Sequence, residues 1–154
     1  MTMLGAQLIQ DRTGQSGAPL LDKAETQGFS LAKELHASVI VATVTEPWSA
    51  IELAAQAQRG AKHPVEDYEK HAAAVAERTL GAASGLAKKM GLACDTIHVK
   101  DEHPAEGIIK TAKANECDLI VMASHGRRGL QRALLGSQTN EVLSHSSVPV
   151  LVCK

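Results

Sequence analysis

The stretch LIVMASHGRRGLQRALLGSQT, residues 119 to 139, decides how this chain is expected to fold. It starts with five apolar residues, 119 to 123, which predict a strand buried on both faces. A loop with two glycines and three arginines follows, and Gly136-Ser137 then stands where a helix is predicted to begin. In open parallel sheets covered by helices, ligands bind beyond the carboxyl ends of the strands. The stretch therefore predicts a strand, a binding loop and a helix, in that order.

The same alternation of apolar runs and helical periodicity extends outward from this stretch. It predicts helices over 20–36, 65–90, 104–115 and 137–145, and strands over 39–44, 94–99, 119–123 and 148–153. Strands that are nearly all apolar and alternate with helices indicate a parallel sheet covered on both faces. The predicted class is α/β, doubly wound. Residues 49–64, which contain Gly60 and Pro64, are the internal segment that comes closest to a disordered one.

The beginning of the chain does not fit this pattern. A doubly wound domain needs a strand before its first helix, but residues 10–18, QDRTGQSGA, are polar and contain glycine. Only AQLIQ, residues 6–10, can supply that strand, and it is short and weakly apolar. The first strand is therefore predicted to be degenerate or replaced. Residues 1–18 are the atypical part of a single domain that spans residues 1–154.

Composition excludes several classes of partner. The chain carries 16 Lys and Arg against 17 Asp and Glu, so its net charge of −1 creates no field that would attract nucleic acid or an anionic membrane. No stretch approaches the roughly 18 apolar residues of a membrane span. The three cysteines are odd in number and widely separated, which is typical of reduced thiols. We expect a cytoplasmic protein that binds neither nucleic acid nor membrane.

The loop carries groups that suit a phosphate. Glycine at 126 and 136 lets backbone N–H groups approach a ligand closely. The hydroxyls of Ser137 and Thr139 lie at a predicted helix N-terminus, where unpaired N–H groups and the helix dipole favour an anion. Neither the P-loop nor the dinucleotide-binding glycine pattern is present. The alternative is a plain turn with a helix cap, beside arginines that only face solvent.

With these motifs on view, the sequence resembles the universal stress proteins. Their ATP-binding members carry Gly-x-x-Gly-x9-Gly-Ser/Thr after the fourth strand, and Ala123-x-x-Gly126-x9-Gly136-Ser137 matches that spacing with alanine at the first glycine. The resemblance runs from about residue 17 to the C-terminus through TVTEPW, YEKHA, LLGSQT and VPVLVCK. It implies a five-stranded parallel sheet of order 3-2-1-4-5. It also implies ATP or AMP as ligand, with the presence of Mg²⁺ left open.

The resemblance further implies which residues form the site. It places the adenine against the end of the second strand, at Val44. The residues that it assigns to the ribose and phosphates are Met122, Ala123, His125, Gly126, Gly136, Ser137, Gln138 and Thr139. Arg127, in the same loop, is a further candidate for phosphate contact on its charge alone. It also implies a homodimer formed through the last strand, Val148 to Cys153, whose edge is otherwise open.

The chain departs from the family at its start. The family's first strand ends in an aspartate that reaches the ribose or a metal, and Ser16 stands at that place here. We hypothesise a shifted reading frame upstream of residue 17, which resequencing and an intact mass matching this N-terminus would refute. The leading function is a stress-response protein that binds an adenine nucleotide. The alternative is an interaction module of the same fold that binds none.

Enzymatic activity is the third possibility, and it extends at most to weak ATP hydrolysis. The sequence predicts no catalytic residues, because no general base is positioned near the phosphates. Asp11 and Asp22 are candidates for that role only if the N-terminus folds in an unexpected way. His98 and His103 flank a strand end and are candidates for a metal site. The simpler alternative is that both are solvated loop residues.

Overall fold

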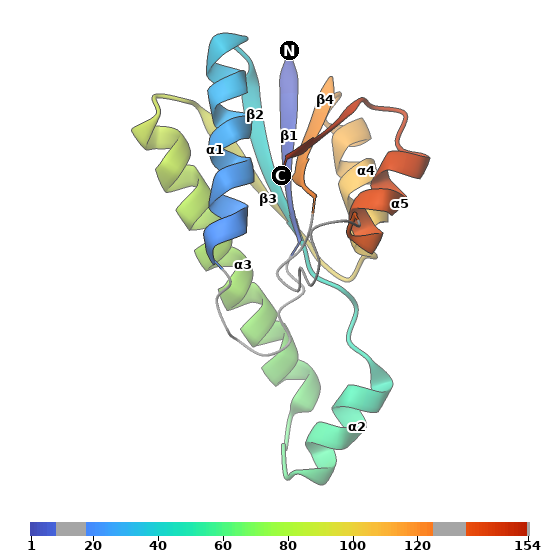
Figure 1. The fold of residues 1–154 in the computed structure, drawn as a ribbon. Helices are drawn as coiled ribbons and strands as arrows, with labels where there is room; N and C mark the ends of the chain where they lie inside the picture. Colours follow the sequence, from blue (N-terminus) through green and yellow to red (C-terminus); the bar gives the residue numbers. More distant parts are fainter. Residues whose placement is uncertain (9–17, 125–134, 154) are drawn as a thin grey trace.

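Five parallel strands form one sheet in the order β3-β2-β1-β4-β5 in the computed structural model, which describes residues 1–8, 18–124 and 135–153 (Figure 1). The strands are β1 (Thr2–Leu8), β2 (Ser38–Val44), β3 (Cys94–Val99), β4 (Leu119–Ala123) and β5 (Val150–Cys153). Every neighbouring pair is parallel. The predicted α/β class and strand order are confirmed.

Helices cover both faces of this sheet. The helices of the described residues are α1 (Ala18–Glu34), α2 (Ala50–Gln58), α3 (Pro64–Lys89), α4 (Pro104–Ala114) and α5 (Ser137–His145), and all but α2 pack against the sheet. One face packs against α1 and α3, where Phe29 and Leu80 join Val41 in a buried cluster. The opposite face packs against α4 and α5, where Ile108 and Val142 are fully buried. None of the helices in the described part of the chain is both long and apolar enough to cross a bilayer.

The first strand lies at the centre of the sheet, and the bounds 6–10 predicted for it are wrong. It begins at Thr2 and pairs with β2 along its whole length and with β4 on its other side. Met3 and Leu4 point to opposite faces and are 2% and 0% exposed, so each belongs to one of the two cores. The Thr2 N–H donates to Asp118 Oδ2 at 2.7 Å, and the Asp118 N–H donates to the Thr2 carbonyl at 2.8 Å. These bonds fix the register against β4.

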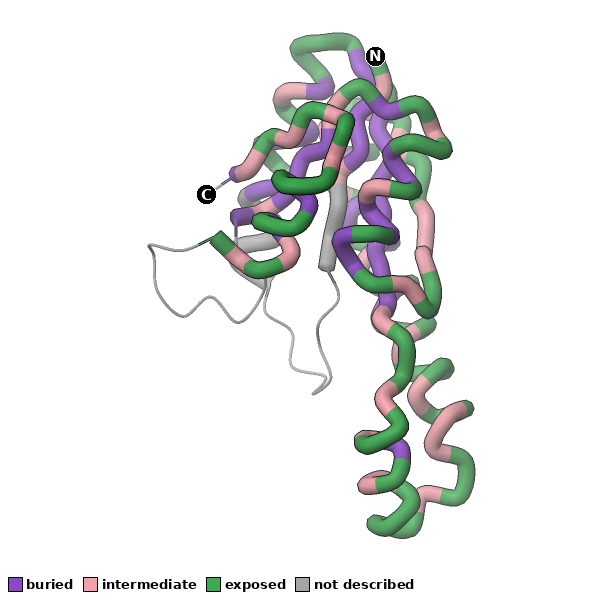
Figure 2. The backbone as a smooth tube through the Cα atoms, turned by 90° about the vertical axis from the view of Figure 1, so that its right-hand side faces the viewer, coloured by how far each residue is buried: buried purple, intermediate pink, exposed green. Residues whose placement is uncertain are grey.

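Two further segments differ from the sequence prediction. Residues 49–64 contain α2, which packs against the first half of α3. Helix α2 and the first half of α3 project beyond the carboxyl edge of the sheet, and most of this projection is exposed (Figures 1 and 2). The alanine-rich composition explains the helix, because alanine has the highest intrinsic helix propensity. The last strand begins at residue 150 and not at 148, because Pro149 has no N–H to donate to a neighbouring strand.

Candidate functional site

The carboxyl ends of the strands meet at one edge of the sheet, and most of the predicted site residues lie there. Because β1 lies between β2 and β4, the strand order reverses at this point, which is where open α/β sheets bind ligands. Val44 ends β2, and Met122 and Ala123 end β4. A hydrogen bond from Thr139 to the Ala123 carbonyl holds the start of α5 against the same end of β4. His125, Gly126 and Arg127 lie outside the described residues.

The N-terminus of α5 offers backbone donors at this edge. Gly136 is the N-cap residue, and its φ of −58° and ψ of 148° belong to ordinary extended backbone. Its N–H donates to the Ser124 carbonyl at 2.9 Å, so this amide is already engaged. The next amides, those of Ser137, Gln138 and Thr139, occupy the first helical turn, whose N–H groups have no acceptor within the helix. These three amides and the helix dipole suit an anion.

Two side chains of the same turn make hydrogen bonds within the fold, and the third is exposed. Thr139 is 2% exposed, and its Oγ1 donates to the Ala123 carbonyl at 3.1 Å. The Oε1 of Gln138 accepts a hydrogen bond from the Ala105 N–H, in the first turn of α4, at 3.2 Å. Ser137 is exposed. The turn thus presents one exposed hydroxyl beside its backbone amides, while its two neighbouring side chains hold the turn in place.

Two of the residues predicted to border the adenine and ribose are core residues near the carboxyl ends of their strands. Val44 is 0% and Met122 is 2% exposed, and both belong to the core that α4 and α5 cover. A Cβ added at Gly107 of α4 would lie 3.0 Å from Val44 Cγ1, so α4 can approach the end of β2 this closely only because residue 107 is glycine. Ala123 is half-buried and borders the turn of α5 directly.

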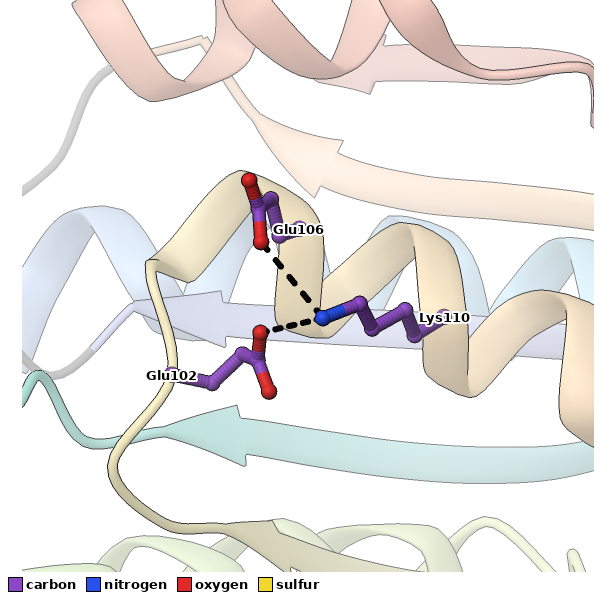
Figure 3. Close-up of polar contacts among 3 residues, drawn as sticks. All are labelled: Glu102, Glu106 and Lys110. Atoms are coloured by element: carbon purple, nitrogen blue, oxygen red, sulfur yellow. Dashed lines mark hydrogen bonds and ion pairs between the residues drawn. The ribbon is translucent and has the colours of Figure 1, made fainter.

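A charged cluster lies at the start of α4, beside the same edge (Figure 3). Lys110 donates to Glu102 Oε1 and lies 3.5 Å from Glu106 Oε2. The hydrogen bond from Lys110 lowers the pKa of Glu102, and the bond to Glu102 raises the pKa of Lys110. A general base works best with a pKa near the working pH, so this direction disfavours Glu102 in that role. Of the candidates from sequence, Asp22 lies in α1 and Asp11 lies outside the described residues.

A cavity of about 260 Å³ lies between the ends of β2 and β3 and helix α3, and the sequence interpretation missed it. Its lining residues are Thr45, Tyr68, Glu69, Ala72, His98, Lys100 and Asp101. His98 Nε2 lies 2.8 Å from Thr45 Oγ1, and His103 is the exposed N-cap residue of α4. Among the described residues, no group of three or more His, Cys, Asp or Glu side chains comes together as a metal site would require. The signal available in the sequence was the run of polar residues at the ends of two apolar strands.

The environment of His98 leads to a prediction about its titration. Burial, and then the charge of Lys100, lower the pKa of His98 below its ordinary value of 6.5. We expect its NMR titration midpoint below 6.5 and a partial upward shift in Lys100→Gln, while Lys113→Gln, at the far end of α4, leaves it unchanged. As the pH falls, His98 takes up a proton in the unfolded chain before it does so in the folded one. Its contribution to the free energy of unfolding is therefore fully present above pH 6.5 and falls as the pH drops below that value. A midpoint at or above 6.5 would contradict this assignment.

Comparison with known proteins adds independent information. The model of the universal stress protein family matches residues 14–154. Universal stress protein MJ0577 of Methanocaldococcus jannaschii is 47% identical over 51 residues, which cover 33% of this chain and 32% of that relative. The chain thus spans about a third of that relative in sequence. The solved structure of MJ0577 is similar over 99% of this chain and 94% of its own, with a TM-score of 0.74 and 25% identity.

Two other solved structures share the fold. One is the universal stress protein from Archaeoglobus fulgidus in complex with dAMP, with a TM-score of 0.61, 15% identity and coverage of 100% of this chain and 98% of that chain. The other is a universal stress protein in complex with cAMP, with a TM-score of 0.65, 20% identity and coverage of 99% and 96%.

Proposed function

This chain belongs to the universal stress protein family, and from that premise we propose that it binds an adenine nucleotide, ATP or AMP, where β4 ends and α5 begins. The first turn of α5 is the observation that carries the proposal. Its three N–H groups and the exposed Ser137 hydroxyl form a donor set at the positive end of a helix, next to the strand-order reversal. Nitrogen and hydroxyl donors suit phosphate oxygens better than they suit a divalent cation.

The proposal assigns a role to every predicted site residue except Gly136, whose N–H is engaged with Ser124. The backbone amides of 137–139 and the Ser137 hydroxyl hold the phosphates, and Val44, Met122 and Ala123 form the wall beside the adenine and ribose. His125, Gly126 and Arg127, which follow the end of β4 in sequence, are proposed as further phosphate contacts. The complexes of fold relatives with dAMP and cAMP support the choice of adenine.

The proposed cellular role is a cytoplasmic, homodimeric stress-response protein that acts through partner contacts. The edge strand β5 supports the dimer, because an unpaired strand edge invites pairing with a second chain. Leu151 on this strand is 38% exposed, which leaves apolar surface for such a contact.

Equilibrium binding of labelled ATP and labelled AMP to the purified full chain tests the proposal. We expect a saturable isotherm for at least one of the two nucleotides, with competition by the unlabelled compound. Binding that fails to saturate up to millimolar nucleotide would overturn the proposal.

The second candidate is an interaction module of the same fold that binds no nucleotide. Two observations favour it: the Gly136 N–H already donates to Ser124, and Ser16 stands where the resemblance calls for an aspartate. In that case both labelled nucleotides fail to bind, while the fold and the β5 edge are unchanged.

A further inference from the structure

The first turns of α4 and α5 are joined by one side chain. Pro104 occupies the first position of α4 and has no N–H, so Ala105 is the first residue of this helix whose amide needs an acceptor. His103, the N-cap residue, makes no side-chain cap bond in the described structure. The acceptor is Gln138 Oε1, at 3.2 Å, from the first turn of α5. Gln138 therefore caps a helix other than its own.

The turn of α4 that Gln138 caps is itself wedged against the sheet. Pro104 and Ala105 are buried, with Ala105 1% exposed. Ile108, three residues after Ala105, is fully buried in the same core. Between them, Gly107 leaves only 3.0 Å between its ideal Cβ position and Val44 Cγ1. Because this packing leaves no free space between α4 and Val44, a movement of the first turn of α4 also displaces the end of β2.

The other side of the α5 turn is fixed to β4. Thr139 Oγ1 donates to the Ala123 carbonyl, so the turn is held by one side-chain bond to β4 and by one to α4. The path from the proposed phosphate donors to the proposed adenine wall thus runs through Gln138, Ala105 and the Gly107 contact with Val44. Two halves of one site are linked by these packed groups.

We propose that Gln138 is a positioning residue of the nucleotide site, and this inference rests on the proposed function. Its carboxamide holds α4, and thereby sets the separation between the α5 turn and the end of β2. Only its backbone N–H faces the phosphates. This assignment differs from a direct phosphate contact by the side chain, because a positioning residue affects the binding of the adenosine part of the ligand as well.

Gln138→Met and Gln138→Glu separate these two roles. Methionine keeps the length of the side chain and removes the acceptor, whereas glutamate keeps an acceptor for the Ala105 N–H. Adenosine is the decisive ligand, since it carries no phosphate that a carboxylate could repel. Asn140→Ala, which shortens an exposed side chain in the same helix, is the matched control. Binding of ATP and adenosine is measured by calorimetry, and Ala105 amide exchange is measured by NMR.

We expect Gln138→Met to weaken ATP and adenosine by the same factor, about fivefold, which corresponds to one neutral hydrogen bond. Gln138→Glu is expected to bind adenosine as tightly as the wild type does. Asn140→Ala should leave the affinities for ATP and adenosine unchanged. The Ala105 amide exchanges faster in Gln138→Met only. A loss of ATP affinity with unchanged adenosine affinity would assign the side chain to the phosphates and overturn the proposal, as would unchanged affinity for both ligands.

The wild-type protein separates failure of this inference from failure of the proposed function. If the wild type binds neither ligand, the proposed function fails and the positioning role fails with it. If the wild type binds but the variants do not follow the expected pattern, only the positioning role fails. The amide exchange of Ala105 shows in both cases whether Gln138 holds α4, and circular dichroism confirms that each variant is folded.

Discussion

A Gly136→Asp variant will keep the wild-type fold and lose at least about a hundredfold in affinity for ATP. The backbone angles of Gly136 are open to any residue, and aspartate is among the best N-cap residues, so the helix does not suffer. The new carboxylate stands among the proposed phosphate donors. At about 4 Å and an effective dielectric constant near 20, two like unit charges repel by roughly 4 kcal/mol, a factor of about a thousand before salt screening.

Gly136→Asn is the matched control, because asparagine has nearly the size of aspartate and is also a good N-cap residue but carries no charge. We expect it to bind ATP within a few-fold of the wild type. Thermal unfolding of the two variants should agree, which shows that any difference in binding is electrostatic. Equal ATP affinity in the aspartate and asparagine variants would place the phosphates away from the α5 turn.

Leu4→Asp is expected to prevent folding. Leu4 is 0% exposed on the central strand, in the core that α4 and α5 cover. The variant loses the burial of a leucine, at about 2–5 kcal/mol, and also buries a carboxylate among the apolar side chains of this core, at several kcal/mol more. A domain of this kind has only about 5–15 kcal/mol of stability in total. Urea unfolding should therefore show no cooperative transition in this variant.

Ile51→Asp makes the same kind of change at a site that is 82% exposed and should leave the urea midpoint nearly unchanged. Leu4→Ala gives a graded version, with an expected loss of about 2–5 kcal/mol in the free energy of unfolding. The three variants test whether residues 2–8 form the central strand. A wild-type unfolding curve for Leu4→Asp would refute that assignment.

Periodicity predicted those elements whose own residues carry the signal. The strands at 94–99 and 119–123 and the helix at 137–145 were predicted with their observed bounds. The first strand was misplaced because Thr2, Gly5 and Gln7 dilute its apolar character. Its place depends on partners far along the chain: Ser38 donates from its N–H to the Met1 carbonyl, and Asp118 anchors Thr2. Such contacts cannot be deduced from a local pattern.

The candidate site divides in the same way. The sequence located the N-terminus of α5 at Gly136-Ser137, because glycine and serine before a helix are a local signal. It did not show that Gln138 caps α4, a contact between residues 33 apart, or that Thr139 bonds to β4. The cavity beside His98 depends on how α3 lies over two strand ends, and no spacing in the sequence encodes that arrangement.

The central place of β1 has a consequence for how the chain acquires its structure during synthesis. Thr2 and Asp118 are 116 residues apart, so β1 pairs on one side with a strand that leaves the ribosome much later than β1 itself. Until β4 has been translated, one edge of β1 has no partner from its own chain. Because open strand edges pair with other chains, the nascent protein is most exposed to aggregation over this interval. Contacts of such long range also slow folding.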